Sequence, residues 1–165
     1  MRVCRHYVAM EMEMIPEDIL PAMAGQRLAR GVARGLRGLD FVSVEEFTPQ
    51  PGLRVDLMAL GPKGELWVIE CKSSRADYLS DRKWQNYLEW GDRFFWAVGP
   101  DFPVDLLPDD TGLILADAYG GEVVRMAPEH PLAPARRKKI TNLFARHAAR
   151  QLHALRDPLG GLNAF

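Results

Sequence analysis

Three charged residues in two neighbouring apolar segments are the part of the sequence best suited to chemistry. Asp56 interrupts the segment 54–60, and Glu70 and Lys72 close the segment 66–72. Residues two apart in a strand project from the same face, so Glu70 and Lys72 share a face. If residues 61–65 form a five-residue hairpin loop, Leu60 faces Leu66 and Asp56 lies opposite Glu70. The spacing therefore predicts one patch with two carboxylates and an ammonium group.

Two opposed carboxylates repel each other, and the repulsion grows when they are desolvated. A divalent cation would balance them. Carboxylate oxygens and a backbone carbonyl suit Mg²⁺ (or Mn²⁺), which keeps its other positions for water and phosphate. We therefore expect metal ligands at Asp56, Glu70 and the carbonyl of Cys71, with Lys72 orienting water or stabilising charge on phosphorus. The alternatives are a structural ion pair between Lys72 and Glu70 or Asp56, or a merely charged strand edge.

Hydrophobic periodicity defines the elements that must position this patch. Apolar residues recur every four positions from Leu20 to Leu36, which predicts a helix over 16–37 that Gly38 ends. Strands are expected at 41–47, 54–60, 66–72, 93–98, 112–116 and 122–126, and helices at 79–90 and 133–155. The first three strands should be antiparallel, and the helix at 79–90 permits a parallel crossover to the fourth. This order predicts an α/β fold with a mixed sheet and helices on both faces.

Length and composition favour one globular domain. The chain has 165 residues, 21 Lys and Arg, 22 Asp and Glu, and two cysteines. We expect a single domain over 16–156, an N-terminal arm or edge strand at 1–15, and a tail at 157–165. The early acids, the scarcity of cysteine and the short apolar runs favour a cytoplasmic protein with no membrane span.

Four segments carry a resemblance to known proteins. In order, they read RVDLMAL (54–60), LWVIECKSSRADY (66–78), DRKW through Tyr87 (81–87) and TGLILADAY (111–119). These segments resemble the MmcB-like family of bacterial DNA repair proteins. The α-β-β-β-α-β order, with an acid on the second strand and E-x-K on the third, resembles the PD-(D/E)xK phosphodiesterase superfamily. The resemblance implies a restriction-endonuclease-like, three-layer α/β/α core with extra C-terminal strands and a basic C-terminal helix.

The resemblance also implies roles for individual residues. It places metal ligands at Asp56 and Glu70, the catalytic lysine at Lys72, and a fourth acid at Glu46. Glu46 is preferred to Glu45 because the family's acid stands ten positions before the aspartate. Either glutamate could instead be a solvated strand end. Where the family tends to have two successive arginines, this chain has a leucine followed by Arg54, which removes one phosphate contact.

Basic residues are segregated along the chain in a way that favours a phosphate-rich partner. Residues 134–156 hold seven Lys or Arg and no acid, so the net charge of −1 divides into +7 there and −8 elsewhere. A second basic row occupies one face of the first helix. We expect DNA binding that depends on DNA structure or damage rather than on sequence, since no base-reading module is recognisable. Solvated helix faces are the alternative. The candidate DNA contacts are Arg27, Arg30, Arg34, Arg54, Lys83, Tyr87, Lys139, Arg146 and Arg150.

Together these features favour a metal-dependent, endonuclease-like phosphodiesterase that acts on DNA in repair. The alternative is a catalytically weak or inactive nuclease-fold module that binds DNA or recruits repair proteins. Cleavage of both strands of a duplex would favour a homodimer.

Overall fold

The computed structural model describes residues 19–81 and 83–158 of the chain. The expected N-terminal arm at 1–15, and the tail at 157–165 apart from its first two residues, lie outside the described residues. The elements are α2 (Ile19–Arg37), β1 (Val42–Gln50), β2 (Leu53–Leu60), β3 (Leu66–Lys72), α3 (Arg75–Ser80), the 3₁₀ helix η1 (Trp84–Trp90), β4 (Arg93–Val98), the 3₁₀ helix η2 (Val104–Leu106), β5 (Gly112–Ala116), β6 (Gly121–Arg125) and α4 (Pro134–Arg156).

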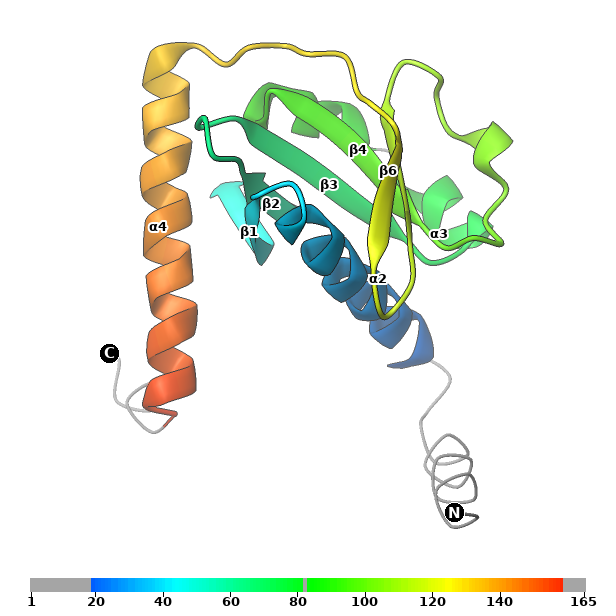
Figure 1. Cartoon of the computed structure of the whole chain (residues 1–165), viewed down its shortest axis with the longest axis horizontal. Coiled ribbons are helices and arrows are strands. Elements are labelled where there is room, and N and C mark those ends of the chain that lie inside the picture. Colours follow the sequence, from blue (N-terminus) through cyan, green and yellow to red (C-terminus); the bar gives the residue numbers. More distant parts are fainter. Residues whose placement is uncertain (1–18, 82, 159–165) are drawn as a thin grey trace.

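The six strands form one mixed sheet in the order β1-β2-β3-β4-β5-β6 (Figure 1). The pairs β1–β2, β2–β3 and β5–β6 are antiparallel, whereas β3–β4 and β4–β5 are parallel. Leu60 pairs with Leu66. The predicted hairpin register and the parallel crossover after β3 are therefore confirmed.

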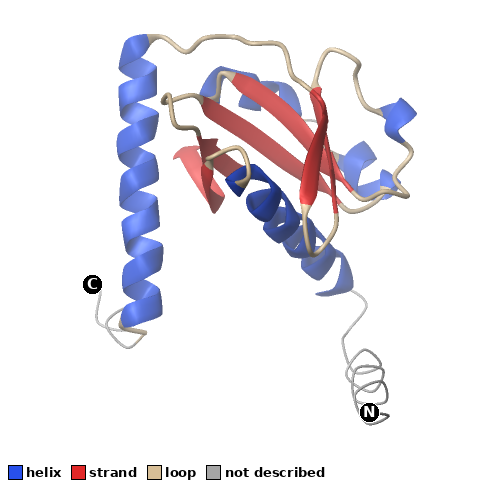
Figure 2. Ribbon diagram, viewed as in Figure 1, coloured by secondary structure: helices blue, strands red, loops and turns tan. Residues whose placement is uncertain are grey.

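Helices cover both faces of the sheet, as expected for a mixed α/β protein (Figure 2). On one face, Leu28, Val32 and Leu36 of α2 pack against β-strand residues such as Leu57 and Ile69. The other face is covered by η1 and the first half of α4, whose buried side chains are Tyr87, Trp90, Ile140 and Phe144. Alternate residues of β3 and β4 thus belong to two separate cores.

A buried aspartate anchors α4 to the sheet. Asp92 is 2% exposed, and its carboxylate accepts hydrogen bonds from the backbone N–H groups of Leu66 (2.8 Å) and Leu132 (2.9 Å). The guanidinium of Arg137 donates to both carboxylate oxygens, at 2.7 and 2.6 Å. Burial alone would raise the pKa of Asp92, but these hydrogen bonds outweigh burial and hold the pKa below its ordinary value. Arg137, counted above with the basic residues of 134–156, is therefore structural.

The expectation of one α-helix over 79–90 is wrong. The chain forms a short α-helix, α3, and then the separate 3₁₀ helix η1. Aromatic side chains of η1 are drawn onto the sheet: Trp84 stacks on Phe94 with ring centroids 5.6 Å apart, and Tyr87 also stacks on Phe94. Trp84 therefore packs against the core of the protein.

None of the helices in residues 19–81 and 83–158 has the length and hydrophobicity needed to cross a bilayer.

Candidate functional site

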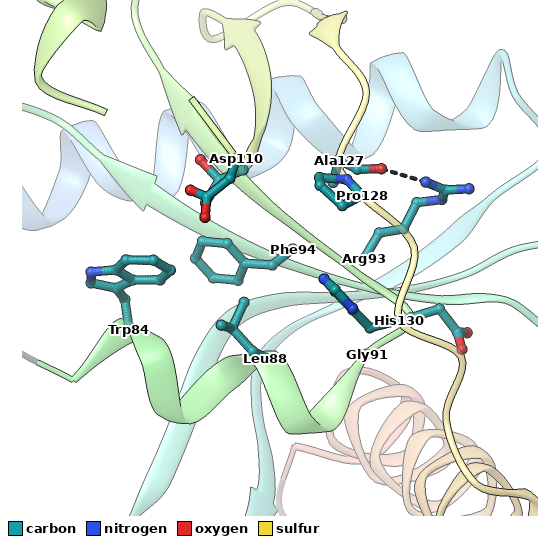
Figure 3. A pocket seen from close by; sticks show the side chains of 11 residues that line it. Trp84, Leu88, Gly91, Arg93, Phe94, Asp110, Ala127, Pro128 and His130 are labelled. Atoms are coloured by element: carbon teal, nitrogen blue, oxygen red, sulfur yellow. Dashed lines mark hydrogen bonds between the residues drawn. The ribbon is translucent and has the colours of Figure 1, made fainter. Parts of the chain in front are cut away.

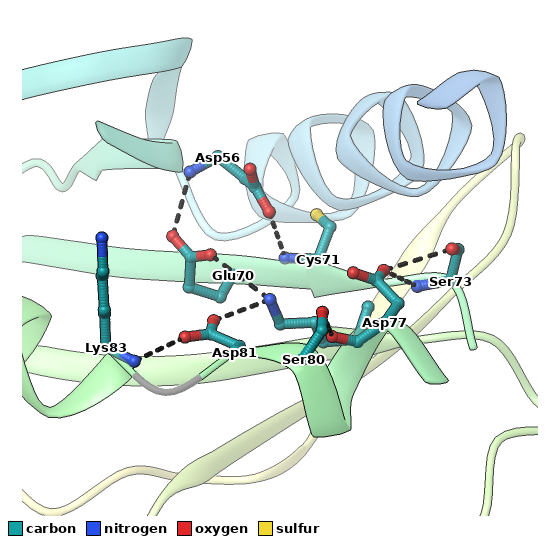
Figure 4. Close-up of polar contacts among 9 residues, drawn as sticks. Asp56, Glu70, Cys71, Ser73, Asp77, Ser80, Asp81 and Lys83 are labelled. Atoms are coloured by element: carbon teal, nitrogen blue, oxygen red, sulfur yellow. Dashed lines mark hydrogen bonds and ion pairs between the residues drawn. The ribbon is translucent and has the colours of Figure 1, made fainter. Parts of the chain in front are cut away.

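The candidate site lies where β2 and β3 part. Regular pairing of the two strands ends at Leu57 and Ile69. One residue further, the backbone N–H of Asp56 donates to Oε1 of Glu70 (3.1 Å), and the backbone N–H of Cys71 donates to Oδ2 of Asp56 (2.8 Å) (Figure 4). Two carboxylates thus take the place of backbone carbonyls in the hydrogen-bond ladder, and Asp56 and Glu70 are held side by side.

The alternation of side chains along β2 slips at Asp56. Leu57 and Ala59 pack on the α2 face, and Met58 packs on the opposite face. Val55 packs on the same face as Met58, although the two residues are three apart. A regular strand would place them on opposite faces. The slip therefore falls on Asp56 and frees its carboxylate to reach the backbone of β3.

Glu70 is almost fully withdrawn from solvent, with 4% of its surface exposed. Burial and the neighbouring charge of Asp56 raise the pKa of Glu70 to about 9, and the attraction of Lys72 offsets them only in part. Burial also raises the pKa of Asp56, although the hydrogen bond from Cys71 opposes the shift. In the metal-free chain, Glu70 is therefore protonated at neutral pH.

Lys72 is paired mainly with an acid that the spacing did not identify as its partner. Its Nζ lies 2.7 Å from Oδ2 of Asp81 and 3.9 Å from Oε2 of Glu70. Burial would lower the pKa of Lys72, but the hydrogen bond and charge of Asp81 outweigh burial and raise it. Lys72 is therefore an ammonium group at neutral pH. No local signal could reveal this pairing, because α3 must first turn the chain back onto β3.

Asp77 has a structural role at the start of α3. Its carboxylate accepts from the backbone N–H of Ser73 (2.9 Å), and its own backbone N–H donates to Oγ of Ser74, the N-cap residue (3.2 Å). Such reciprocal bonds satisfy backbone donors that a helix start leaves unpaired. Asp77 thus stabilises the start of α3, while Asp81 contacts Lys72.

The charges of the site residues and the direction of the Cys71 carbonyl show whether the site suits a divalent cation. Asp56, Glu70 and Asp81 can together carry three negative charges beside the buried cation Lys72, and the exposed Arg54 also attracts Asp56. The N–H and C=O of one strand residue point to the same side, so the carbonyl of Cys71 also points toward the gap beside β2. Within the described residues, no group of three His, Cys, Asp or Glu side chains is arranged for a metal. Two carboxylates, one carbonyl and water still fit the preferences of Mg²⁺.

The thiol of Cys71 takes no part in this donor set. It lies in the α2-side core, and burial raises its pKa well above the ordinary value. The expected contribution of Cys71 is thus confined to its backbone.

Glu46 and Arg54 lie at the exposed margin of the site. Glu46 has a left-handed backbone, with φ of 51°, and its Oε1 lies 3.7 Å from Nη1 of Arg54. Glu45 pairs with Leu57, whose side chain lies on the α2 face, away from Glu70. Of the two glutamates, Glu46 is therefore the one at the level of Asp56, but its side chain is paired with Arg54.

The structure separates Lys83 from Tyr87, which a continuous α-helix over 79–90 would place one turn apart on one face. Lys83 is exposed before η1, and its backbone N–H donates to Oδ1 of Asp81. Tyr87 is buried, and burial together with the charge of Glu70 raises the pKa of its hydroxyl. Only Lys83 of this pair has a side chain open to solvent.

The two basic rows lie on different sides of the molecule. The apolar face of α2 packs on the sheet face opposite Glu70 and Lys72, so Arg27, Arg30 and Arg34 are exposed on the far side from the site. On α4, Lys139 lies 5.5 Å over the ring of Trp90, on the same sheet face as Glu70. The exposed side chains of Arg146 and Arg150 continue that row at helical spacing.

A small aromatic pocket lies at the other end of β4 (Figure 3). Phe94, Trp84 and Leu88 line it together with Asp110 and His130, and its volume is about 70 Å³. This volume is about that of two water molecules. It is therefore too small for a nucleobase, and we assign no ligand to it.

The fold and site define an α/β protein whose mixed sheet opens between two strands around buried acids and a lysine. The chain belongs to the MmcB-like family: the model described as DNA repair protein MmcB-like matches residues 17–159. Membership of this family indicates a role in DNA repair.

A solved structure agrees with this fold. The SPO1766 protein of unknown function from Silicibacter pomeroyi is 69% identical, with a TM-score of 0.82. The match covers 83% of this chain and 94% of that chain. A comparison with curated proteins finds no significant match.

Proposed function

We propose that the protein is a metal-dependent phosphodiesterase of the PD-(D/E)xK type, with a restriction-endonuclease-like core, that cleaves DNA during repair. One observation carries the proposal: Asp56, Glu70 and Lys72 converge where the β2–β3 ladder opens, and buried acids there outnumber the cation. An ion pair kept only for stability would not need the further buried acid Glu70, because a carboxyl group that burial holds protonated at neutral pH lowers the stability of the fold.

Asp56, Glu70 and the Cys71 carbonyl would hold Mg²⁺ or Mn²⁺. When bound, the ion supplies Lewis-acid polarisation of a phosphoryl oxygen and lowers the pKa of coordinated water. The hydrogen bond and charge of Asp81 raise the pKa of Lys72, so Lys72 carries its proton in the metal-free chain. Its ammonium group donates hydrogen bonds to the attacking water or to the phosphoryl oxygens, where negative charge grows in the transition state. Asp81 holds Lys72 in place for this task.

The row Lys139, Arg146 and Arg150 is the best placed to contact DNA, because it shares the sheet face of the site. Arg54 at the site margin and Lys83 before η1 add exposed positive charge. Such contacts neutralise phosphates without selecting a sequence, as structure-dependent repair requires.

The test is cleavage of single-stranded, nicked and branched DNA in Mg²⁺ or Mn²⁺, with EDTA as the blank. We expect Lys72→Ala to abolish cleavage and the exposed Lys63→Ala to leave it unchanged. Asp56→Asn keeps an acceptor for the Cys71 N–H and removes the charge, so it should fold normally and be inactive. Asp56→Ala should lose activity together with stability, because it leaves that N–H unpaired.

The outcomes separate the two candidate functions. Cleavage that persists in Lys72→Ala and Asp56→Asn would exclude this site. A wild-type protein that binds DNA in an anisotropy assay but never cleaves it would favour the alternative, a nuclease-fold module that binds DNA or recruits repair proteins. The burial of Glu70 and the short Lys72–Asp81 pair are the observations that favour this alternative.

A further inference from the structure

An open groove lies along the free edge of the sheet, apart from the candidate site. The edge strand β1 forms its floor, and α2 and the end of α4 form its walls. The groove has a volume of about 910 Å³, and its lining includes Arg30, Arg37, Val42, Gln151, Ala154 and Leu155. Figure 1 shows α4 passing β1 and continuing beyond the sheet.

The floor offers backbone hydrogen-bonding groups. The carbonyl of Glu45 points away from β2, since it lies 3.0 Å from Nε2 of His147 on α4. N–H and C=O groups alternate sides along a strand, so the backbone of Ser43 also faces outward into the groove. Because His147 already holds the carbonyl of Glu45, and the N–H of Phe41 donates to Leu36, the outward groups left for pairing are centred on Ser43. They can serve as a template for a short extended chain.

One wall is apolar and lacks a packing partner within the described residues. The first half of α4 is held by Ile140 and Phe144, but every residue from 149 to 158 is exposed. Leu155 is 80% exposed at the groove. A helix end that extends beyond its own core gains stability only when another surface covers its apolar side chains.

The opposite wall is basic. Arg30 and Arg37 of α2 line it, and Glu45 is the single acid among the lining residues. A second copy of the chain would bring the same arginines together, so self-association through this groove is opposed by charge. A nucleic acid could contact Arg30 and Arg37, but it would not pair with the outward backbone of β1 and would not cover Leu155.

We propose that this groove binds an extended peptide of a partner protein in which acidic and apolar residues alternate. The backbone of the peptide pairs with the outward groups of Ser43 as a short added strand, next to the point where His147 of α4 holds the carbonyl of Glu45. Successive side chains then point to opposite walls. Its acidic side chains meet Arg30 and Arg37, and its apolar side chains cover Ala154 and Leu155.

This inference is independent of the proposed nuclease activity. The arginine wall belongs to α2, which covers the sheet face opposite Glu70 and Lys72. A partner in the groove therefore leaves the candidate site accessible, as expected for a protein brought to its place of action by recruitment.

The experiment measures fluorescence anisotropy of a short fluorescein-labelled peptide in which Glu alternates with Val and Leu, titrated with the full chain. Binding should weaken at least about tenfold, or 1.4 kcal/mol, in Arg30→Glu/Arg37→Glu. Arg27→Glu is the matched control, because Arg27 lies on the same helix row but outside the groove lining, and it should bind as the wild type does. Thermal melting verifies that all variants are folded.

Two further probes test the added strand without changing the protein. In an extended peptide, alternate backbone N–H groups point to opposite edges. N-methylation of every second residue therefore removes the donors of one edge only. Methylation of the edge that faces β1 should abolish binding, and methylation of the other edge should not. A peptide of the same composition with all its glutamates at one end should bind at least tenfold more weakly.

Equal binding of the alternating and clustered peptides, or equal loss in Arg27→Glu, would show simple charge attraction and overturn the proposal. Displacement of the peptide by an equimolar thymidine oligonucleotide would show a nucleic-acid surface and would also overturn it.

Discussion

Glu70→Gln should stabilise the metal-free protein at neutral pH. The pKa of Glu70 is about 9 in the folded chain against 4.5 for the free side chain, chiefly because of burial. At pH 7 the unfolded chain has lost this proton and the folded chain retains it. One pKa unit corresponds to about 1.4 kcal/mol, so the 2.5 pH units between 4.5 and 7 cost up to about 3.5 kcal/mol of stability. Glutamine escapes this cost and keeps an oxygen for the N–H of Asp56.

The sign of the pH dependence follows from proton counting. Between pH 4.5 and about 9 the folded chain binds more protons at Glu70 than the unfolded chain does. The free energy of unfolding of the wild type therefore falls as pH rises through this window. The stability advantage of Glu70→Gln should be small near pH 5 and should grow through pH 7 to about pH 8.5.

The assay is urea unfolding in EDTA at these pH values, with the exposed Glu122→Gln as the matched control. Excess Mg²⁺ should then stabilise the wild type at pH 8.5 more than it stabilises Glu70→Gln, because the ion binds the ionised carboxylate of the folded state. A variant less stable than the wild type at pH 8.5 in EDTA would refute the reasoning. It would mean that ionised Glu70 gains more from Lys72 than it loses by burial.

Two further substitutions test the packing that supports the site. Asp92→Ala should lower the free energy of unfolding by about 3 kcal/mol, since it strands Arg137 and two backbone donors. Asp109→Ala, which breaks only an exposed ion pair, should change the free energy of unfolding by less than about 0.5 kcal/mol. Equal losses of the two variants in urea unfolding would show that Asp92 does not anchor α4. Gly35→Ala should cost at least about 2 kcal/mol, because its Cβ would lie 2.0 Å from a backbone oxygen of β6. Gly25→Ala on the same helix has open space and should be neutral or stabilising, so a similar loss of melting temperature in both variants would contradict this account.

The order and register of the elements could be predicted because their signals are local. Period-2 and period-4 patterns mark the strands and the long helices, and a short loop leaves the β2–β3 hairpin little choice of register. The same local patterns gave a wrong prediction for the segment 79–90. Its spacing suits an α-helix, but Trp84, Tyr87 and Trp90 gain more by packing on the sheet than a regular helix would allow.

The site was predictable only in its strand residues. Asp56, Glu70 and Lys72 lie close in sequence and are brought together by one hairpin, so their spacing carries the information. Asp81 reaches Lys72 through the turn of α3, and the separation of the two arginine rows depends on which sheet face each helix covers. Neither arrangement leaves a periodic trace in the sequence.

The departures from regular β-structure are concentrated where the candidate chemistry lies. Glu46 adopts a left-handed backbone, and the alternation of β2 slips at Asp56 at the same level of the sheet. Both irregularities cost conformational energy, and a paired ladder would avoid them. A paired ladder, however, would also engage the N–H and carbonyl of Cys71 and leave two buried carboxylates with nothing to bind. The irregular backbone thus exchanges regular strand pairing for hydrogen bonds from the N–H groups of Asp56 and Cys71 to the two carboxylates.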